Sequence, residues 1–502
     1  MRLISFALVC LLSWPASPAL AADALGVVAP VLEEGRVRER PDPAGRAVPV
    51  VRRVQDGDVH AVVQREAREG FTARMLELDA LARGLAAPSR REPTWLYLSP
   101  EDGGFARHGF WLLGEDGERY VDAPYIDLVV DADSLADGSF EELFAHEMGH
   151  VFLRRLLPSL PAGYSRAPHH AFTITDYPTA FDEGFAIHFQ LLARRLTANT
   201  RLRAIDHGFD TRPFLPWWLS HRDRSLRIQG VRANLFVQAQ RPMQGVADAL
   251  AAGQMSPEFD ATRLRNGQQM LSSEGVVATL FHRWIGETPA DGLAAAYRPW
   301  FEAMAAMQAR PLHPDSPLPV LLLRELHARD AAAGQGAIGI FMDTTYGATV
   351  DPALPRQAGE LALAGATGDI ETYVGRLKPA RDALAAAREA VLADPSRLDA
   401  ALGPGLWLLA DGEQGIAVNL NSAEAAQLSA LGLPGQAVSR LLESRRSGAA
   451  FSGIADAAAR AGLDAGTVSR LEAQAAAMRA AGVMAVLLDR VRRWSGAADR
   501  YP

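Results

Sequence analysis

The hydrophobic positions along the chain predict a mainly helical protein with a small β region. Residues 61–86 carry leucines and a methionine at helical spacing, which predicts one amphipathic helix. Residues 94–130 change to short apolar runs separated by Gly- and Asp-rich turns, which predicts strands. From 139 to about 340 the pattern is again mainly helical, and residues 353–400 are an alanine-rich helix. The expected fold class is therefore mainly α (α+β) with a small N-terminal β-sheet. The expected strands are residues 95–98, 110–113 and 126–130.

Changes of this pattern also suggest where the segments of the chain begin and end. Residues 22–60 are rich in Pro, Arg and Val without a clear period, which predicts an extended lead-in. Residues 341–346, Phe-Met-Asp-Thr-Thr-Tyr, predict a strand and turn. Residues 415–480 form a separate, repetitive helical unit. The expected segments are a leader, a lead-in with a helix, a central domain, a helical linker, a C-terminal module and a final helix with tail, at residues 1–21, 22–93, 94–350, 351–410, 411–480 and 481–502.

The leader has the pattern of a cleaved signal peptide. Arg2 precedes a short apolar run, and Ala19-Leu20-Ala21 matches a small-residue cleavage site. The alternative is an N-terminal membrane anchor, but the run is shorter than the ~18–20 apolar residues that cross a bilayer. We expect cleavage near Ala21, no stable membrane insertion afterwards, and a periplasmic or secreted protein.

Composition narrows the class of protein further. The 502 residues are 48% hydrophobic with a formal charge of −8, which excludes a mostly disordered chain and gives no reason to expect a broad nucleic-acid footprint. The single cysteine, Cys10, lies inside the leader. A disulfide framework and a Cys-rich zinc or iron–sulfur site are therefore excluded, which leaves histidine and carboxylate as the strong zinc ligands.

A His-Glu-Met-Gly-His sequence carries the candidate chemistry. Ser139 is a good N-cap and Glu142 completes a capping box, so the sequence is expected on a helix. On a helix, positions i and i+4 lie on one face, so His146 and His150 can bind one ion. Imidazole pairs of this kind suit Zn²⁺, with Glu147 as general base on the metal-bound water. The alternative is a surface helix with two incidental histidines, which the flanking apolar residues disfavour.

A catalytic zinc needs a third protein ligand and an open position for water. Two carboxylates are candidates. Glu183 stands 33 positions after His150 in a segment where Thr179 can N-cap a second helix. Glu274 lies in a similar Ser-Glu-Gly-Val sequence at a much greater distance.

The first of these segments resembles a known family. A His-Glu-x-x-His helix followed by a helix that opens with Glu-Gly-Phe-Ala is similar to the gluzincin metallopeptidases, which include thermolysin and the relatives of alanyl aminopeptidase. The resemblance covers residues 139–195 and implies that an extended peptide binds along the strand 126–130 that precedes the metal helix. Ile187 stands where thermolysin relatives often have an acidic residue, and no Gly-Ala-Met-Glu-Asn motif is present. The implied site residues are the zinc ligands His146, His150 and Glu183 and the base Glu147.

A peptidase mechanism follows from such an ion. Zinc polarises the scissile carbonyl and lowers the pKa of its bound water, and Glu147 passes the water's proton to the leaving amine. The oxyanion needs a second donor, for which we select His188, on the third-ligand helix, and Tyr177. Asp176 or Asp182 can orient a ligand histidine, with helix capping as the alternative for both. Further candidates for the donor are His169, His170 and His221.

The C-terminal module resembles the tandem helix-hairpin-helix unit of the competence DNA-receptor type. The resemblance rests on Asn-Leu-Asn-Ser-Ala at residues 419–423, a Leu-Pro-Gly hairpin at 433–435 and a second hairpin near Gly462. Such hairpins aim backbone N–H groups at a phosphate. Asp464 stands where a glycine is expected, and its carboxylate repels phosphate. We therefore expect a packing or protein-docking module in preference to a DNA-binding one.

Together these observations predict an exported zinc-dependent peptidase that acts on a peptide or protein. The alternative is an exported, non-catalytic binding protein with a structural or vestigial metal site, whose module engages DNA or a protein partner. Glu147 favours the enzyme, since a structural site does not need that base. The sequence leaves the cleavage preference and the oligomeric state open.

Overall fold

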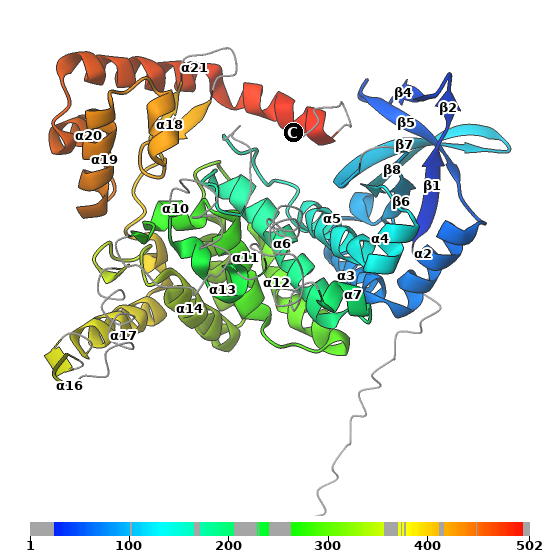
Figure 1. Ribbon diagram of the computed structural model, residues 1–502, viewed down its shortest axis with the longest axis horizontal. Helices are drawn as coiled ribbons and strands as arrows, with labels where there is room; N and C mark the ends of the chain where they lie inside the picture. Colours follow the sequence, from blue (N-terminus) through cyan, green and yellow to red (C-terminus); the bar gives the residue numbers. More distant parts are fainter. Residues whose placement is uncertain are drawn as a thin grey trace, which may run out of the picture.

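The computed structural model describes most of the chain (Figure 1). The expected signal peptide and the candidate histidines His169, His170 and His221 lie outside the described residues. Helices dominate the described part and the longer strands all lie before residue 130, which confirms a mainly helical α+β chain. The described residues are 25–100, 103–164, 171–204, 228, 230–239, 263–355, 370–372, 374–375, 378–410, 416–447 and 449–494.

Five strands of the first 130 residues form a small closed barrel, and β2 pairs with β3 in a separate two-stranded sheet. The five hydrogen-bond in the order β1-β6-β8-β7-β5, and the pairing of β1 with β5 closes the ring, while β4 extends it beyond β5. The predicted extended lead-in is therefore part of the same sheet as the three predicted strands. The strands are β1 (Gly26–Pro30), β2 (Leu32–Glu33), β3 (Arg36–Val37), β4 (Glu39–Pro41), β5 (Ala47–Arg53), β6 (Trp95–Leu98), β7 (Phe105–Gly114) and β8 (Gly117–Leu128).

Alternate residues of these strands serve two separate cores. Side chains such as Val51, Phe110 and Tyr125 pack against one another inside the barrel. Their neighbours Leu96 and Ile126 join the main core, which the helices dominate. The alternation follows from the two-residue period of a strand, and it fixes the barrel against the helical body.

The predicted peptide-binding edge is not an edge. Ile126 of β8 pairs with Leu96 of β6 on one side and with Ala106 of β7 on the other. Strand β8 is therefore an inner strand with hydrogen-bonded neighbours on both sides, and the prediction of a peptide-binding edge at 126–130 was wrong. Strand β7 pairs with β5 only through Trp111 and Leu112, so its first half has a strand partner on one side alone within the described residues.

The helical body follows the barrel. Its α-helices are α2 (Asp58–Glu69), α3 (Phe71–Leu85), α4 (Ala132–Asp137), α5 (Ser139–Leu156), α6 (Tyr177–Leu196), α7 (Thr200–Ala204), α10 (Gly267–Leu271), α11 (Glu274–Ile285), α12 (Leu293–Met307), α13 (Leu318–Arg329), α14 (Ala331–Thr345), α16 (Ile370–Thr372) and α17 (Lys378–Ala393). Its 3-10 turns are η1 (Pro88–Arg90), η3 (Leu235–Val237), η5 (Ala290–Gly292) and η7 (Pro395–Asp399).

Two local predictions fail within this body. The single helix expected over 61–86 is two helices that meet at Gly70, where a Cβ would collide with the carboxylates of Glu66 and Glu141. The strand and turn expected over 341–346 form the end of α14. Phe341 and Met342 are fully buried in the main core, so tertiary packing of a helix overrides their local β-propensity.

The C-terminal module has its own hydrophobic core. Residues from Leu408 to Ala475, including Phe451 and Leu471, pack together apart from the main core. Helix α21 continues without a break through the boundary expected at residue 480. The module lies along one side of the helical body (Figure 1). Its elements are β9 (Trp407–Leu409), β10 (Ala417–Asn419), α18 (Ala425–Ala430), α19 (Gly435–Ser447), α20 (Ile454–Ala461) and α21 (Ala465–Trp494).

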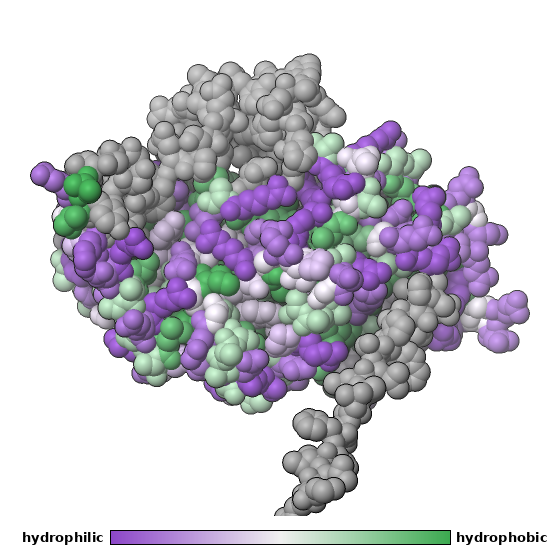
Figure 2. Space-filling model, turned by 90° about the horizontal axis from the view of Figure 1, so that it is seen from below, coloured by the Kyte–Doolittle hydropathy of each residue, from purple (hydrophilic) through white to green (hydrophobic). Residues whose placement is uncertain are grey.

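The outside of the molecule shows a mixed surface. On the face seen in Figure 2, hydrophobic residues are scattered among hydrophilic ones. Among the described helices, none has both the length and the apolar character needed to cross a bilayer.

Candidate metal centre

The two helices that carry the candidate ligands pack at very short range. Gly149 of α5 lies against Ala186 of α6, and a Cβ on Gly149 would sit 2.8 Å from the Ala186 Cα atom. Gly184 makes the equivalent approach to α11, where a Cβ would sit 2.6 Å from the Glu274 carbonyl oxygen. Gly149 thus allows the close contact between α5 and α6 that brings His150 and Glu183 together, and Gly184 allows α6 to pack closely on α11.

Both helices begin differently from the prediction. Gly138, with φ of 81°, precedes α5, and Glu142 forms an ion pair with the buried Arg194 of α6 at 3.0 Å instead of a capping box. Helix α6 is capped by Asp176, whose carboxylate accepts from the Thr179 amide at 2.8 Å. The capping interpretation of Asp176 is therefore confirmed, and an N-cap role for Ser139 or Thr179 was wrong.

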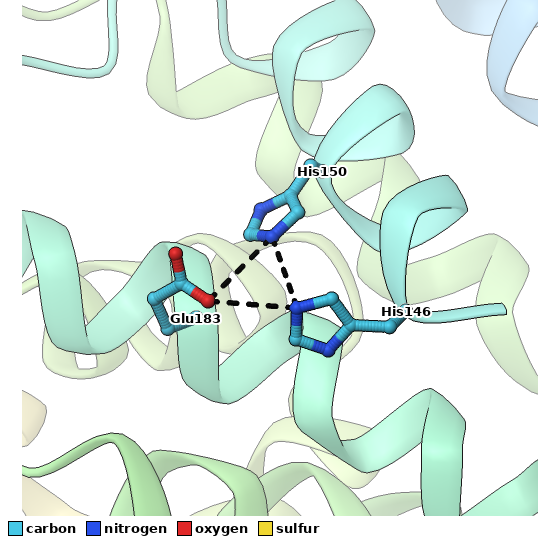
Figure 3. A group of neighbouring side chains, drawn as sticks. All are labelled: His146, His150 and Glu183. Atoms are coloured by element: carbon cyan, nitrogen blue, oxygen red, sulfur yellow. Dashed lines mark hydrogen bonds and ion pairs between the residues drawn. The ribbon is translucent and has the colours of Figure 1, made fainter. Parts of the chain in front are cut away.

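Three predicted ligands converge on one point between α5 and α6 (Figure 3). The Nε2 atoms of His146 and His150 are 3.3 Å apart, and each lies 3.6 Å from Glu183 Oε2. Ligands about 2.0–2.1 Å from a tetrahedral zinc are separated by about 3.3–3.4 Å. Within the described part of the chain, His146, His150 and Glu183 form a potential metal-binding group, and their ligand atoms all lie within 4.8 Å of one another. The donor set and its spacing therefore fit Zn²⁺.

Side-chain exposure leaves room for a fourth ligand. The His150 side chain is 8% exposed, whereas those of His146 and Glu183 are 14% and 19% exposed. The cluster is thus buried on the His150 side and reachable from the other side. A catalytic zinc needs such an open position for water, whereas a structural zinc is closed by four protein ligands.

His150 is held by a carboxylate behind it. Its Nδ1 atom lies 2.7 Å from Asp182 Oδ1, and Arg154 donates to the other Asp182 oxygen at 3.2 Å. Burial disfavours the charged imidazole, but Asp182 and Glu183 outweigh it and raise the pKa of His150 to about 9. With Nδ1–H donated to Asp182, Nε2 points into the cluster as a ligand atom.

This support was only partly predictable from the sequence. Asp182 was one of two candidates for orienting a histidine, and Arg154 was missed. Arg154 stands four residues after His150, so the same i, i+4 rule that joins the two histidines also predicts its position on this face of α5.

The predicted base lies at the same place. Glu147 is 4% exposed, and its Oε1 atom lies 4.0 Å from His146 Nε2. Asp127 of β8 lies near enough for the Glu147 charge to raise its pKa, although burial is the larger cause and Arg107 opposes both. Glu147 thus combines two properties of a general base, namely a low-dielectric environment and proximity to the ligand cluster.

His188 faces away from this cluster. Its ring is fully buried among the aromatic side chains of Phe185, Phe189 and Phe281. Nδ1–H donates to the Phe185 carbonyl, and Nε2 accepts from the Tyr297 hydroxyl at 2.5 Å. Burial lowers the pKa of His188 to about 3, so the ring is neutral and both nitrogens are satisfied. The prediction of a catalytic His188 was therefore wrong.

Two further candidates are Tyr177, for the oxyanion donor, and Glu274, for the third ligand. Tyr177 is the first residue of α6 and packs in the main core, where burial raises the pKa of its hydroxyl. Within the described part of the chain, Tyr177 has no hydrogen bond or ion pair to the ligand cluster, so its role stays a prediction. Glu274 begins α11 and is 1% exposed, but its carboxylate lies outside the described ligand group, which favours Glu183 as the third ligand.

Comparison with known proteins adds no identification. Neither a protein-family model, nor a curated protein, nor a solved structure matches this chain.

Proposed function

We propose that this chain is an exported zinc-dependent peptidase with a gluzincin-like site. The observation that carries the proposal is the convergence of His146, His150 and Glu183 at separations of 3.3 to 3.6 Å, with Glu147 beside them. Export rests on the signal-peptide pattern that ends near Ala21.

Each residue of the site would have its own role in hydrolysis. His146, His150 and Glu183 would hold the zinc. The bound zinc would polarise the scissile carbonyl and lower the pKa of its water. Glu147 would accept the proton of that water and deliver it to the leaving amine. Asp182 fixes the orientation of His150 through its Nδ1 atom. The donor that stabilises the oxyanion is a separate group, for which Tyr177 is the candidate left on α6.

The first half of β7 is the best place for an extended peptide. Among the described residues, Phe105–His108 pair with a strand on one side only, which is β8, and β7 and β8 both contact α5. Backbone groups along such an edge can pair with an added strand. The peptide would then run beside the metal helix, on β7 and not on the strand that the family resemblance indicated.

The experiment that tests the proposal separates metal binding from chemistry. Purified mature protein is expected to contain about one zinc per chain by elemental analysis. Glu147→Gln is expected to keep that zinc and to lower the hydrolysis of an unfolded protein substrate about 10²- to 10⁴-fold, because a general base contributes about that much. A metal-free wild type, or equal hydrolysis by both proteins, would overturn the proposal.

The module gives no comparable support for the DNA-binding alternative. Asp464 accepts from the Thr467 amide at 2.8 Å, so a carboxylate of the chain itself occupies the start of α21. A phosphate at the second hairpin would meet that negative charge. This departure from the helix-hairpin-helix pattern therefore favours the packing role.

A further inference from the structure

The segment that leads into the third-ligand helix is held from two sides. On the first side it runs along the junction between α10 and α11. The Thr175 amide donates to the Ser272 carbonyl at 2.9 Å, and the Gly275 amide donates to the Ala171 carbonyl at 3.1 Å. Residues 171–175 are therefore fixed to the start of α11 by backbone hydrogen bonds.

On the second side the segment meets the C-terminal module. Gln427 of α18 donates its side-chain amide to the Ile174 carbonyl at 2.8 Å. Beside it, Asn266 donates to the Asn421 carbonyl at 2.8 Å, which ties the start of α10 to the module. The Asn-Leu-Asn-Ser-Ala sequence of the module thus packs on the helical body.

One buried arginine connects the two sides. Arg265 is 1% exposed and bonds to groups from several segments. It donates to the Phe172 carbonyl, to Glu424 of the module at 3.2 Å, and to Ser273 Oγ at 3.0 Å. A fourth bond reaches the Phe236 carbonyl at 2.9 Å. The planar guanidinium can serve all four acceptors, whereas the ammonium of a lysine has fewer donors and a different geometry.

This junction lies directly before the candidate metal ligand. The segment ends at Asp176, the N-cap of α6, and Glu183 follows seven residues later. At 1.5 Å per residue, the ligand stands about 10 Å along the helix from its cap. The next residue, Gly184, rests on the first residue of α11. The position of Glu183 therefore depends on the same two structures that Arg265 holds together.

We propose that the C-terminal module braces the third-ligand helix, and that Arg265 is the positioning residue that transmits this support to Glu183. The inference rests on the proposed zinc site. It assigns to the module a role in metal affinity, although no residue of the module belongs to the described ligand cluster.

Two variants and a matched control test the brace. Arg265→Lys removes the forked contact, and Glu424→Gln removes the charge of the module's half-exposed partner. Arg324→Lys is the control, because Arg324 also bonds a carboxylate, that of Asp399 at 2.7 Å, and backbone carbonyls, but joins α13 to η7. Zinc affinity is measured by competition with a chromogenic chelator, well below the unfolding temperature of each protein. Hydrogen exchange of residues 171–183 is measured in the metal-free proteins.

Arg265→Lys is expected to weaken zinc binding about tenfold, at the lower end of the cost of losing an outer-shell partner. Glu424→Gln is expected to weaken it less, and both variants are expected to speed exchange over 171–183. Arg324→Lys is expected to lower the unfolding temperature without either change. If Arg265→Lys does not fold, the more exposed Glu424 site carries the test.

Two results would overturn the brace. One is unchanged zinc affinity and exchange in the folded variants at Arg265 and Glu424. The other is an equal change in Arg324→Lys, which would indicate general destabilisation. If the wild type binds no zinc, the proposed function fails, and the exchange measurement still decides whether the module braces the helix.

Discussion

Two faces of helix α6 carry ionisable side chains in contrasting environments. On one face Glu183 meets two histidines of α5, and the group is partly open. On the other face His188 lies fully buried against Phe281 and Tyr297, with both nitrogens hydrogen-bonded. The difference shows that a histidine is a candidate ligand when its ring nitrogen lies beside other ligand atoms at a solvent-accessible position. Its position on the third-ligand helix is not sufficient.

Protonation separates the two faces as well. Carboxylates raise the pKa of His150 to about 9, whereas burial without a carboxylate lowers that of His188 to about 3. The first ring is therefore in a field that attracts a cation. The second ring is stable only as the neutral form.

Removal of the proposed third ligand is expected to have the largest effect on this comparison. Glu183→Ala leaves two histidines and is expected to weaken zinc binding by more than the roughly 10- to 100-fold that an outer-shell loss costs. Glu274→Gln is the matched control, because Glu274 was the other candidate ligand and lies outside the cluster. Equilibrium dialysis against zinc measures both. Equal losses in the two variants would mean that Glu183 is not the ligand.

The next effect concerns the support behind His150. Asp182→Asn is expected to lower zinc affinity about 10- to 100-fold, because the new amide group, unlike the Asp182 carboxylate, does not fix the tautomer of the His150 imidazole. The control is Asp176→Asn, since asparagine is an equally good helix N-cap. Chelator competition should separate the two variants, and similar affinities would refute a role for Asp182 in orienting the ligand.

A stability cycle tests the buried face. His188→Phe strands the Tyr297 hydroxyl in the core and is expected to lower the free energy of unfolding by about 1–3 kcal/mol, with zinc affinity unchanged. Adding Tyr297→Phe removes the stranded group and should restore part of the loss. Denaturant unfolding of the two single variants and the double variant measures the coupling. Weaker zinc binding by His188→Phe would instead return this residue to the site.

The pH dependence of stability tests the same buried face without a change in the site. The folded protein keeps His188 neutral down to about pH 3, whereas an unfolded histidine gains its proton near pH 6.5. The unfolded state therefore binds more protons in that window, and stability falls as the pH falls from 6.5 toward 3. The metal-free wild type is expected to lose stability more steeply there than the His188→Phe, Tyr297→Phe double variant. Parallel curves would contradict a buried neutral histidine.

The helical spacing of the motif was predictable because it is local. His146 and His150 stand four residues apart, and their shared face follows from the geometry of an α-helix. The strands around Trp95, Phe110 and Ile126 were predictable for the same reason, since apolar runs between turns mark strands. The helix caps were less predictable, because Glu142 pairs with the distant Arg194 in place of its own helix end.

Long-range contacts decided the rest. The pairing of β8 with β6 and with β7 removed the expected edge at 126–130, and packing of α14 turned a β-like sequence into helix. The sequence by itself determined the mainly helical class and the candidate ligands, because short periodicities specify both. Only the tertiary structure decided that Glu183, and not Glu274, joins the histidines, that His188 faces the core, and that Arg265 links the module to the segment that leads into α6. These outcomes depend on which distant segments pack together, and no local periodicity contains that information.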